Sequence, residues 1–177
     1  GNNAVELLME ERFDNAILFS KEIDEFNLER RGLDKLITGQ ALKQIVDNKE
    51  QNNFSTVVFQ EDWHKGVIGI VASRLIEKHY KPTLVFTKSN DVFAASARSV
   101  KGFDVYNAIE ACKAHLIQFG GHKYAAGLTL KPEDYLAFKK CFEEYVENNI
   151  DEKSLSPVMM VDEKIELAEI TPKFYRI

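Results

Sequence analysis

Residues 54–97 read FSTVVFQEDWHKGVIGIVASRLIEKHYKPTLVFTKSNDVFAASA, and this stretch decides the fold of the chain. Phe54 to Phe59 and Thr83 to Thr87 are short runs rich in β-branched and aromatic residues, which predicts two strands. Val67 to His79, between them, has the character of a helix. A strand, a helix and a second strand in this order predict parallel strands joined by a right-handed crossover.

The following residues extend this unit into an α/β domain with a mixed sheet. A turn is predicted at Ser89-Asn90-Asp91, after which the chain returns as an antiparallel strand. The elements expected from there onward are a strand at Val92 to Ala97, a helix at Val105 to Ala114, a strand at Tyr124 to Leu130 and a helix at Tyr135 to Val146.

The segments that flank this domain differ from it in pattern. Residues 4–49 carry one narrow apolar stripe at helical spacing, which predicts a connector helix over this range. If it is continuous from Phe13 to Val46, it spans roughly 50 Å, with Gly32 and Gly39 as the positions for kinks. After a polar linker, Val158 to Val161 and Lys164 to Leu167 predict a two-strand start of a β domain.

We therefore expect three parts. Residues 1–52 form the connector helix, residues 53–148 the mixed-sheet domain, and residues 149–177 a linker with the truncated start of another domain. We also expect a further domain to precede the connector.

Composition and charge limit the possible classes of function. The chain has 177 residues, a net charge of −5 and no apolar run near the ~20 residues that span a bilayer, so we expect a cytoplasmic protein with no membrane partner. The charge is uneven: residues 62–131 carry 10 Lys and Arg against 5 Asp and Glu. This surplus indicates either an anion site within an acidic protein or lysines, such as Lys78, Lys81 and Lys88, that only solvate the ends of helices and strands. Cys112 and Cys141 indicate neither a disulfide framework nor the ligand spacing of a metal site, and they are interpreted as packing residues.

Two glycines precede a histidine at Gly120-Gly121-His122. Paired glycines let backbone N–H groups approach an anion, and an adjacent imidazole can donate a hydrogen bond to a phosphoryl oxygen. Gly-Gly also marks ordinary turns, and a lone histidine is commonly an exposed loop residue or a core residue bonded to a carbonyl. The motif indicates a phosphate pocket, with these structural roles as the alternatives.

The sequence Ser96-Ala97-Arg98 ends the antiparallel strand. Because side chains alternate along a strand, Ser96 and Arg98 point to the same face. A guanidinium fork and a hydroxyl together suit the oxygens of a terminal phosphate. The alternative is an edge-strand arginine paired with Asp104 or Glu110.

The segment from Trp63 to Gly69 lies between a strand end and a helix start, where free N–H groups favour anions. His64 and Gly66 are therefore candidate phosphate-binding residues. Gly69 and Ser73 are explained by close packing of the helix on the sheet, and Trp63 by packing, with base stacking as its alternative.

These three motifs together resemble the DHH-associated domain of the RecJ-type single-strand-specific DNA exonucleases, in the DHH phosphoesterase superfamily. The resemblance covers most of the chain, including an OB-like start after residue 148. It implies that Ser96 and Arg98 grip the 5′ phosphate of the degraded strand and that Gly120-Gly121-His122 faces the scissile phosphate. The implied role of His122 is to orient that phosphate and stabilise charge in the transition state, with general acid action as a second role.

The resemblance also implies a substrate contact from the connector helix. The Asn-x-x-Arg element of the family matches Asn27 to Arg30 here, so Arg30 is the candidate, and the neighbouring Arg31 competes for the role. The alternative is a solvated helix face.

DHH phosphoesterases use two divalent ions, Mn²⁺ or Mg²⁺, held by aspartates and histidines that include an Asp-His-His sequence. This chain has 4 histidines, none adjacent to another, and lacks that triplet. We expect no metal in this chain, Mn²⁺ or Mg²⁺ in a separate DHH domain, and a fragment that is inactive alone.

The sequence thus predicts part of a 5′→3′ single-strand DNA exonuclease of repair and recombination. Its expected partners are single-stranded DNA, a single-strand-binding protein and a helicase. The alternatives are a nanoRNase or cyclic-dinucleotide phosphodiesterase of the same superfamily, and a nonenzymatic nucleic-acid-binding module.

Overall fold

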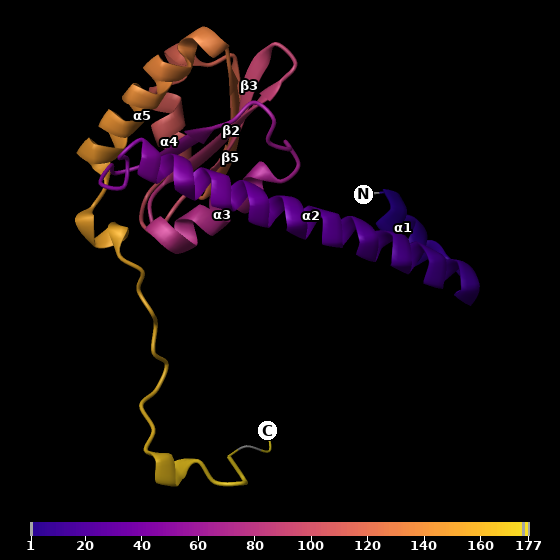
Figure 1. The fold of residues 1–177 in the computed structure, drawn as a ribbon. Coiled ribbons are helices and arrows are strands. Elements are labelled where there is room, and N and C mark those ends of the chain that lie inside the picture. The colour runs from indigo at the N-terminus through magenta and orange to yellow at the C-terminus, as the bar shows by residue number, and fades with distance from the viewer. Residues whose placement is uncertain (1, 175, 177) are drawn as a thin grey trace.

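The computed structural model describes residues 2–174 and 176, which form a five-stranded mixed sheet with helices on both faces (Figure 1). The order across the sheet is β1-β2-β3-β5-β4, with β1 parallel to β2 and every other neighbouring pair antiparallel. The predicted α/β class is confirmed. The strands are β1 (Thr56–Phe59), β2 (Thr83–Ser89), β3 (Val92–Arg98), β4 (Gln118–His122) and β5 (Ala125–Leu130).

Each face of the sheet has its own apolar core. On one face, α2 (Phe13–Asp47) and α3 (Ile68–His79) bury a cluster that includes Ile37, Ala41, Ile45, Val58, Val71, Leu75 and Val85. On the other, α4 (Val105–Ala111) and α5 (Tyr135–Asn149) pack on Leu84, Phe86, Ala95, Ala97, Leu128 and Leu130. Burial there raises the pKa of the Tyr135 phenol well above its usual value, and the nearby Glu50 carboxylate acts in the same direction.

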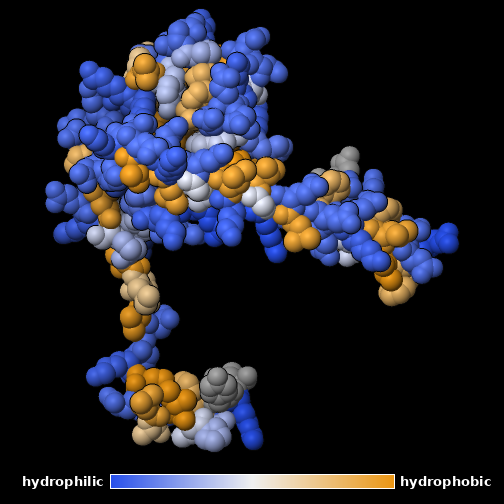
Figure 2. All heavy atoms as spheres, viewed as in Figure 1, coloured by the Kyte–Doolittle hydropathy of each residue, from blue (hydrophilic) through white to orange (hydrophobic). Residues whose placement is uncertain are grey.

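A long helix is found where the sequence predicts one over Phe13 to Val46. α2 has 35 residues and runs without interruption through Gly32 and Gly39. Only its C-terminal part is buried, through Ile37, Ala41 and Ile45, so the rest projects from the body as an arm (Figure 1). Apolar side chains are exposed along this arm (Figure 2). In the described part of the chain, no helix is long and apolar enough to cross a membrane.

Three expectations about the flanking segments and the cysteines need correction. A single helix from residue 4 is wrong, because α1 (Asn2–Met9) ends before α2 begins and the Glu10 carboxylate accepts a hydrogen bond from the Arg12 N–H. The strands predicted at Val158 to Val161 and Lys164 to Leu167 are not formed, since an isolated hairpin has no sheet to complete. Short 3₁₀ turns occur at Lys113–His115, Pro132–Asp134, Glu152–Leu155 and Leu167–Glu169.

The two cysteines also differ from the expectation. Cys112 and Cys141 both pack in the core beneath α4 and α5, as predicted, but they also form a disulfide. Their Cα atoms are 6.0 Å apart, because the end of α4 meets the middle of α5. The pairing follows from the packing of two helices that are separated by the β4–β5 hairpin.

A set of polar contacts ties the segment before β1 to α5. The Glu143 carboxylate accepts hydrogen bonds from the N–H groups of Phe54 and Ser55 and from the Ser55 hydroxyl. Lys139 forms an ion pair of 2.6 Å with Glu50. These contacts satisfy backbone donors that the turn between α2 and β1 leaves free.

Glu143→Ala should lower the free energy of unfolding by about 2–4 kcal/mol, because the donors of residues 54 and 55 lose a charged acceptor. Urea unfolding followed by the fluorescence of the single tryptophan, Trp63, measures the change. Glu144→Ala is the matched control, since that exposed carboxylate only pairs with Lys140 at 3.7 Å and should cost less than about 0.5 kcal/mol. Equal effects of the two substitutions would contradict the assigned role of Glu143.

Candidate functional site

Ser96 and Arg98 lie on the same face of β3, as the alternation predicted. Ala95 and Ala97 point into the core under α4 and α5, while Ser96 and Arg98 are half-buried on the side of α3. The Arg98 guanidinium donates hydrogen bonds to the Ser96 hydroxyl at 3.3 Å and to the Ala97 carbonyl at 2.8 Å. Arg98 therefore bonds to Ser96 and Ala97 and not to Asp104 or Glu110, which were its alternative partners.

Gly120, Gly121 and His122 belong to a strand that the sequence did not predict. They form the end of β4, which pairs with β5 at one edge of the sheet. His122 is exposed, and its Nδ1 accepts a hydrogen bond of 3.3 Å from the Tyr124 N–H. The buried-histidine alternative is therefore wrong. Glycine is uncommon in strands, so strand propensity did not predict β4.

The sheet register brings the Ser-x-Arg and Gly-Gly-His motifs together. On the first rung, Arg98 pairs with Ala125, which pairs with His122. On the next rung, Ser96 pairs with Gly127, which pairs with Gly120. Because neighbouring strands are ~4.8 Å apart, the backbones of Arg98 and His122 are separated by about 10 Å. The small residues of β5 leave the space above this interval free of long side chains.

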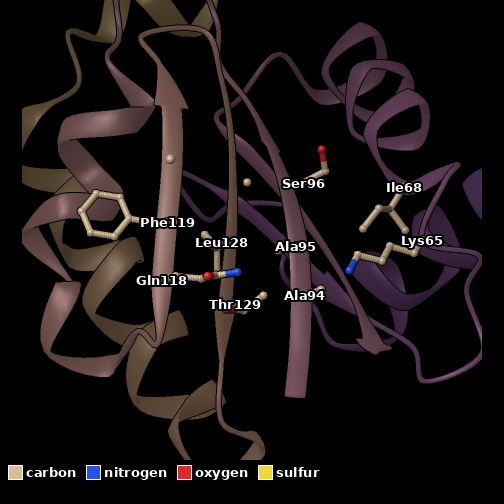
Figure 3. Close-up of a pocket in the computed structure, with 11 residues that line it drawn as sticks. Lys65, Ile68, Ala94, Ala95, Ser96, Gln118, Phe119, Leu128 and Thr129 are labelled. Carbon is tan, nitrogen blue, oxygen red and sulfur yellow. The ribbon is translucent and has the colours of Figure 1, made fainter. Parts of the chain in front are cut away.

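A third rung continues the same surface. Ala94 of β3 pairs with Thr129 of β5, which pairs with Gln118 of β4. A groove of about 500 Å³ lies over the second and third rungs, with Lys65 and Ile68 on its α3 side (Figure 3). Its lining residues, among them Ser96, Gly120 and Gly127, include no aspartate or glutamate. The groove therefore favours an anionic or polar ligand.

Sequence reasoning missed Lys65, Gln118 and Thr129. All three line the groove. Thr129 could have been found by counting two residues from Gly127 along the predicted strand, whereas Gln118 could be counted from His122 only after β4 had been recognised as a strand.

The two glycines of β4 serve different purposes. Gly121 has φ = +146°, and a Cβ there would collide with the Ala125 carbonyl oxygen and with Ala126. At Gly120, a Cβ would meet no atom within 4 Å. Gly121 is thus required by the backbone, whereas Gly120 leaves open space on the groove side of the sheet.

The loop before α3 contributes less than the sequence predicted. The Nδ1 of His64 accepts a hydrogen bond of 3.1 Å from the Gly66 N–H, and neither residue lines the groove. Trp63 is buried and its indole N–H donates to Gln40 at 2.8 Å, which excludes base stacking and confirms its packing role. A Cβ on Gly69 would lie 3.0 Å from the Ser96 hydroxyl and from the Arg98 guanidinium, so that glycine permits close packing.

Arg30 lies at a separate cavity of about 120 Å³ between α2 and α3. Its guanidinium donates to the Asn27 side chain at 3.2 Å. The same cavity is lined by Arg31 and by Arg74, whose guanidinium is 3.7 Å from the Asp34 carboxylate. Arg30 does not line the groove over the second and third rungs, and both Arg30 and Arg31 line this separate cavity instead. Arg98 and His122 lie on the first rung, beside that groove and not among the residues that line it.

Over residues 2–174 and 176, no cluster of three or more His, Cys, Asp or Glu side chains is arranged to hold a metal ion. The polar side chains that line the groove are instead cationic, hydroxyl and amide groups. Such donors can bind and orient a phosphate but do not match a Mg²⁺ or Mn²⁺ site, which needs carboxylate or imidazole ligands.

Comparison with known proteins gives one family and one set of relatives. The family model of the DHHA1 domain matches residues 37–148. The single-stranded-DNA-specific exonuclease RecJ of Bacillus subtilis (strain 168) is 35% identical over 170 residues, which cover 95% of this chain and 22% of that protein. The protein of the same name from Escherichia coli (strain K12) is 27% identical over 175 residues, covering 94% of this chain and 30% of that protein.

Solved structures agree with these sequence relatives. The crystal structure of RecJ in complex with Mg²⁺ from Thermus thermophilus superposes with a TM-score of 0.75 at 25% identity, over 85% of this chain and 23% of that chain. The complex with Mn²⁺ from the same organism gives a TM-score of 0.75 at 27% identity, over 85% of this chain and 22% of that chain. The chain thus spans less than a third of the length of the curated relatives described above.

Gly121→Ala should lower the free energy of unfolding by about 2–4 kcal/mol, because alanine at this positive φ is strained and its Cβ collides with β5. Gly120→Ala should change it by less than about 0.5 kcal/mol, because its Cβ enters open space. Chemical denaturation of the two variants makes the comparison. Similar destabilisation of both would show that Gly120 is also needed for the backbone.

Proposed function

The chain belongs to the DHHA1 domain family, and we propose that it is the substrate-gripping part of a 5′→3′ single-strand-specific DNA exonuclease. The observation that carries the proposal is the register of the sheet, which sets Arg98 and His122 at the two ends of one rung with a small residue between them. The names of the relatives support the assignment to DNA, and we extend it to repair and recombination.

In this proposal, the 5′-terminal phosphate binds to Arg98 and Ser96. The guanidinium offers several N–H donors in a planar fork, and the Ser96 hydroxyl is already within hydrogen-bond distance of it. Both side chains are half-buried, so water screens their charge–phosphate contact less than on an open surface. Gly69 leaves just enough room for this pair beneath α3.

The scissile phosphate binds at the opposite end of the rung, beside His122. His122 is exposed and its Nε2 remains available, because the Tyr124 N–H bonds to Nδ1. The imidazole orients the phosphate and stabilises the charge that develops on its oxygens, and Gly120 lets the substrate approach the strand closely. The two phosphates of one nucleotide thereby span the rung between β3 and β4.

The remaining candidates act outside the groove. We propose that Arg30 contacts a more distant part of the strand, which is supported by the arginines around its cavity. His64 and Gly66 contribute through the loop that carries Lys65 toward the groove. A single-strand-binding protein and a helicase stay predicted partners of the whole protein.

The divalent ions of the reaction are proposed to be held by residues outside this domain. Two crystal structures of RecJ from Thermus thermophilus are complexes with Mg²⁺ and with Mn²⁺, whereas the described residues of this chain offer no matching donor cluster. When bound, such ions supply Lewis-acid activation and a nucleophile. The part assigned to this chain is to bind and orient the strand.

Arg98→Ala should weaken binding of the chain to 5′-phosphorylated single-stranded DNA by roughly tenfold to a hundredfold, or ~1.5–3 kcal/mol, while binding to the 5′-hydroxyl strand changes little. Fluorescence anisotropy at constant salt measures both affinities. Lys101→Ala, which removes a positive charge from the exposed turn after β3, controls for net charge. Equal losses on the two strands after Arg98→Ala would refute end-phosphate recognition.

The purified chain should release no nucleotides from labelled single-stranded DNA in the presence of Mn²⁺, because its described residues gather no metal ligands. Denaturing electrophoresis of timed samples tests this expectation. Metal-dependent release that scales with protein and is lost in His122→Ala would contradict the division of roles proposed here.

A further inference from the structure

The third rung of the groove has polar side chains that phosphate binding does not use. Gln118 and Thr129 face each other across β4 and β5, and both line the groove (Figure 3). Gln118 is exposed and Thr129 half-buried. Among the hydrogen bonds formed by the described residues, none involves the side-chain amide of Gln118 or the hydroxyl of Thr129. These groups are therefore available to a ligand.

The second rung lies between these groups and the first rung, where Arg98 and His122 are, and on β5 and β4 it forms a flat floor. Gly127 and Gly120 occupy it on β5 and β4, and no side chain projects from either. Four residues along an antiparallel strand correspond to about 14 Å, so the first and third rungs are roughly that far apart. A flat group joined to a phosphate on the first rung has room to lie on the glycines and reach the third.

We propose that the base of the 5′-terminal nucleotide lies on the Gly120–Gly127 floor and that its edge hydrogen-bonds to Gln118 and Thr129. This inference rests on the proposed function, because it needs the 5′ phosphate at Arg98. An amide and a hydroxyl each supply both a donor and an acceptor, so they can match the edge of any base. Single-stranded nucleic acids expose these edges, which a duplex hides.

Lys65 lies on the α3 side of the groove, opposite Gln118, and it is not one of the proposed contacts to the base. Its ammonium group donates a hydrogen bond to Ser89 at 3.2 Å, which holds it on the α3 side. Its charge attracts the polyanionic strand to the groove. The contacts that depend on the base are those of Gln118 and Thr129.

The test compares two 5′-phosphorylated oligonucleotides that differ only at the 5′-terminal residue, which is either an ordinary nucleotide or an abasic one. The wild-type chain should bind the ordinary strand about fivefold to tenfold more tightly than the abasic strand. In the double variant Gln118→Ala/Thr129→Val this preference should fall below about twofold, while affinity for the abasic strand stays at the wild-type value. Gln60→Ala, on an exposed glutamine after β1, is the matched control.

Three outcomes would overturn the base-binding role. They are a wild-type chain without preference for the ordinary strand, a variant that keeps the full preference, and a variant that loses affinity for both strands equally. The 5′-hydroxyl oligonucleotide separates this proposal from the one it rests on. If wild type favours the 5′ phosphate but ignores the terminal base, only the base subsite is wrong; if it ignores the phosphate, both proposals fail. Thermal unfolding of the variants confirms that they are folded when measured.

Discussion

The groove depends on the antiparallel register of β3, β5 and β4. Side chains alternate between the faces of a sheet, so a slip of one residue would turn Ser96 and Arg98 into the core and expose their alanine neighbours. The register is held by apolar burial on the other face, where Leu128 and Leu130 pack under α4 and α5. Exposing those two leucines would cost about 3–6 kcal/mol. Burial of the hydrophobic face of the sheet thereby determines which side chains lie on the polar face.

α3 covers one half of the polar face of the sheet and leaves the other half open. α3 packs mainly over β2 and β3, away from the β4 edge of the sheet. Gly69 allows the helix to approach the Ser96–Arg98 pair closely, and Trp63 anchors the preceding loop to α2 through Gln40. The groove thus forms because the helices on this face, α2 and α3, do not extend over all strands of the sheet.

Much of this architecture could be predicted from the sequence because local patterns carry it. The turn at Ser89-Asn90-Asp91 located β3, alternation along that strand gave the shared face of Ser96 and Arg98, and the narrow apolar stripe located α2. β4 was missed because Gly120 and Gly121 lower its strand propensity, although pairing with β5 is enough to form it. Without β4, the rung that joins Arg98 to His122 could not be derived.

The other errors have a similar origin in tertiary structure. The disulfide between Cys112 and Cys141 depends on where α4 and α5 meet, which their sequence separation of 29 does not reveal. The segments predicted as strands after residue 157 have short apolar or alternating patterns but no neighbouring strand. Local pattern therefore predicted elements well and predicted contacts between elements poorly.

The place of β4 at the edge of the sheet also bears on how the protein behaves at high concentration. An open edge can recruit a strand from another molecule, and this begins many forms of aggregation. β4 has only 5 residues, and two of them are adjacent glycines, one with a backbone conformation unlike that of a regular strand. Such a strand is a poor template for a neighbour. Gly120, which leaves the groove open, and Gly121, which sets the backbone, thus together discourage self-association at this edge of the sheet.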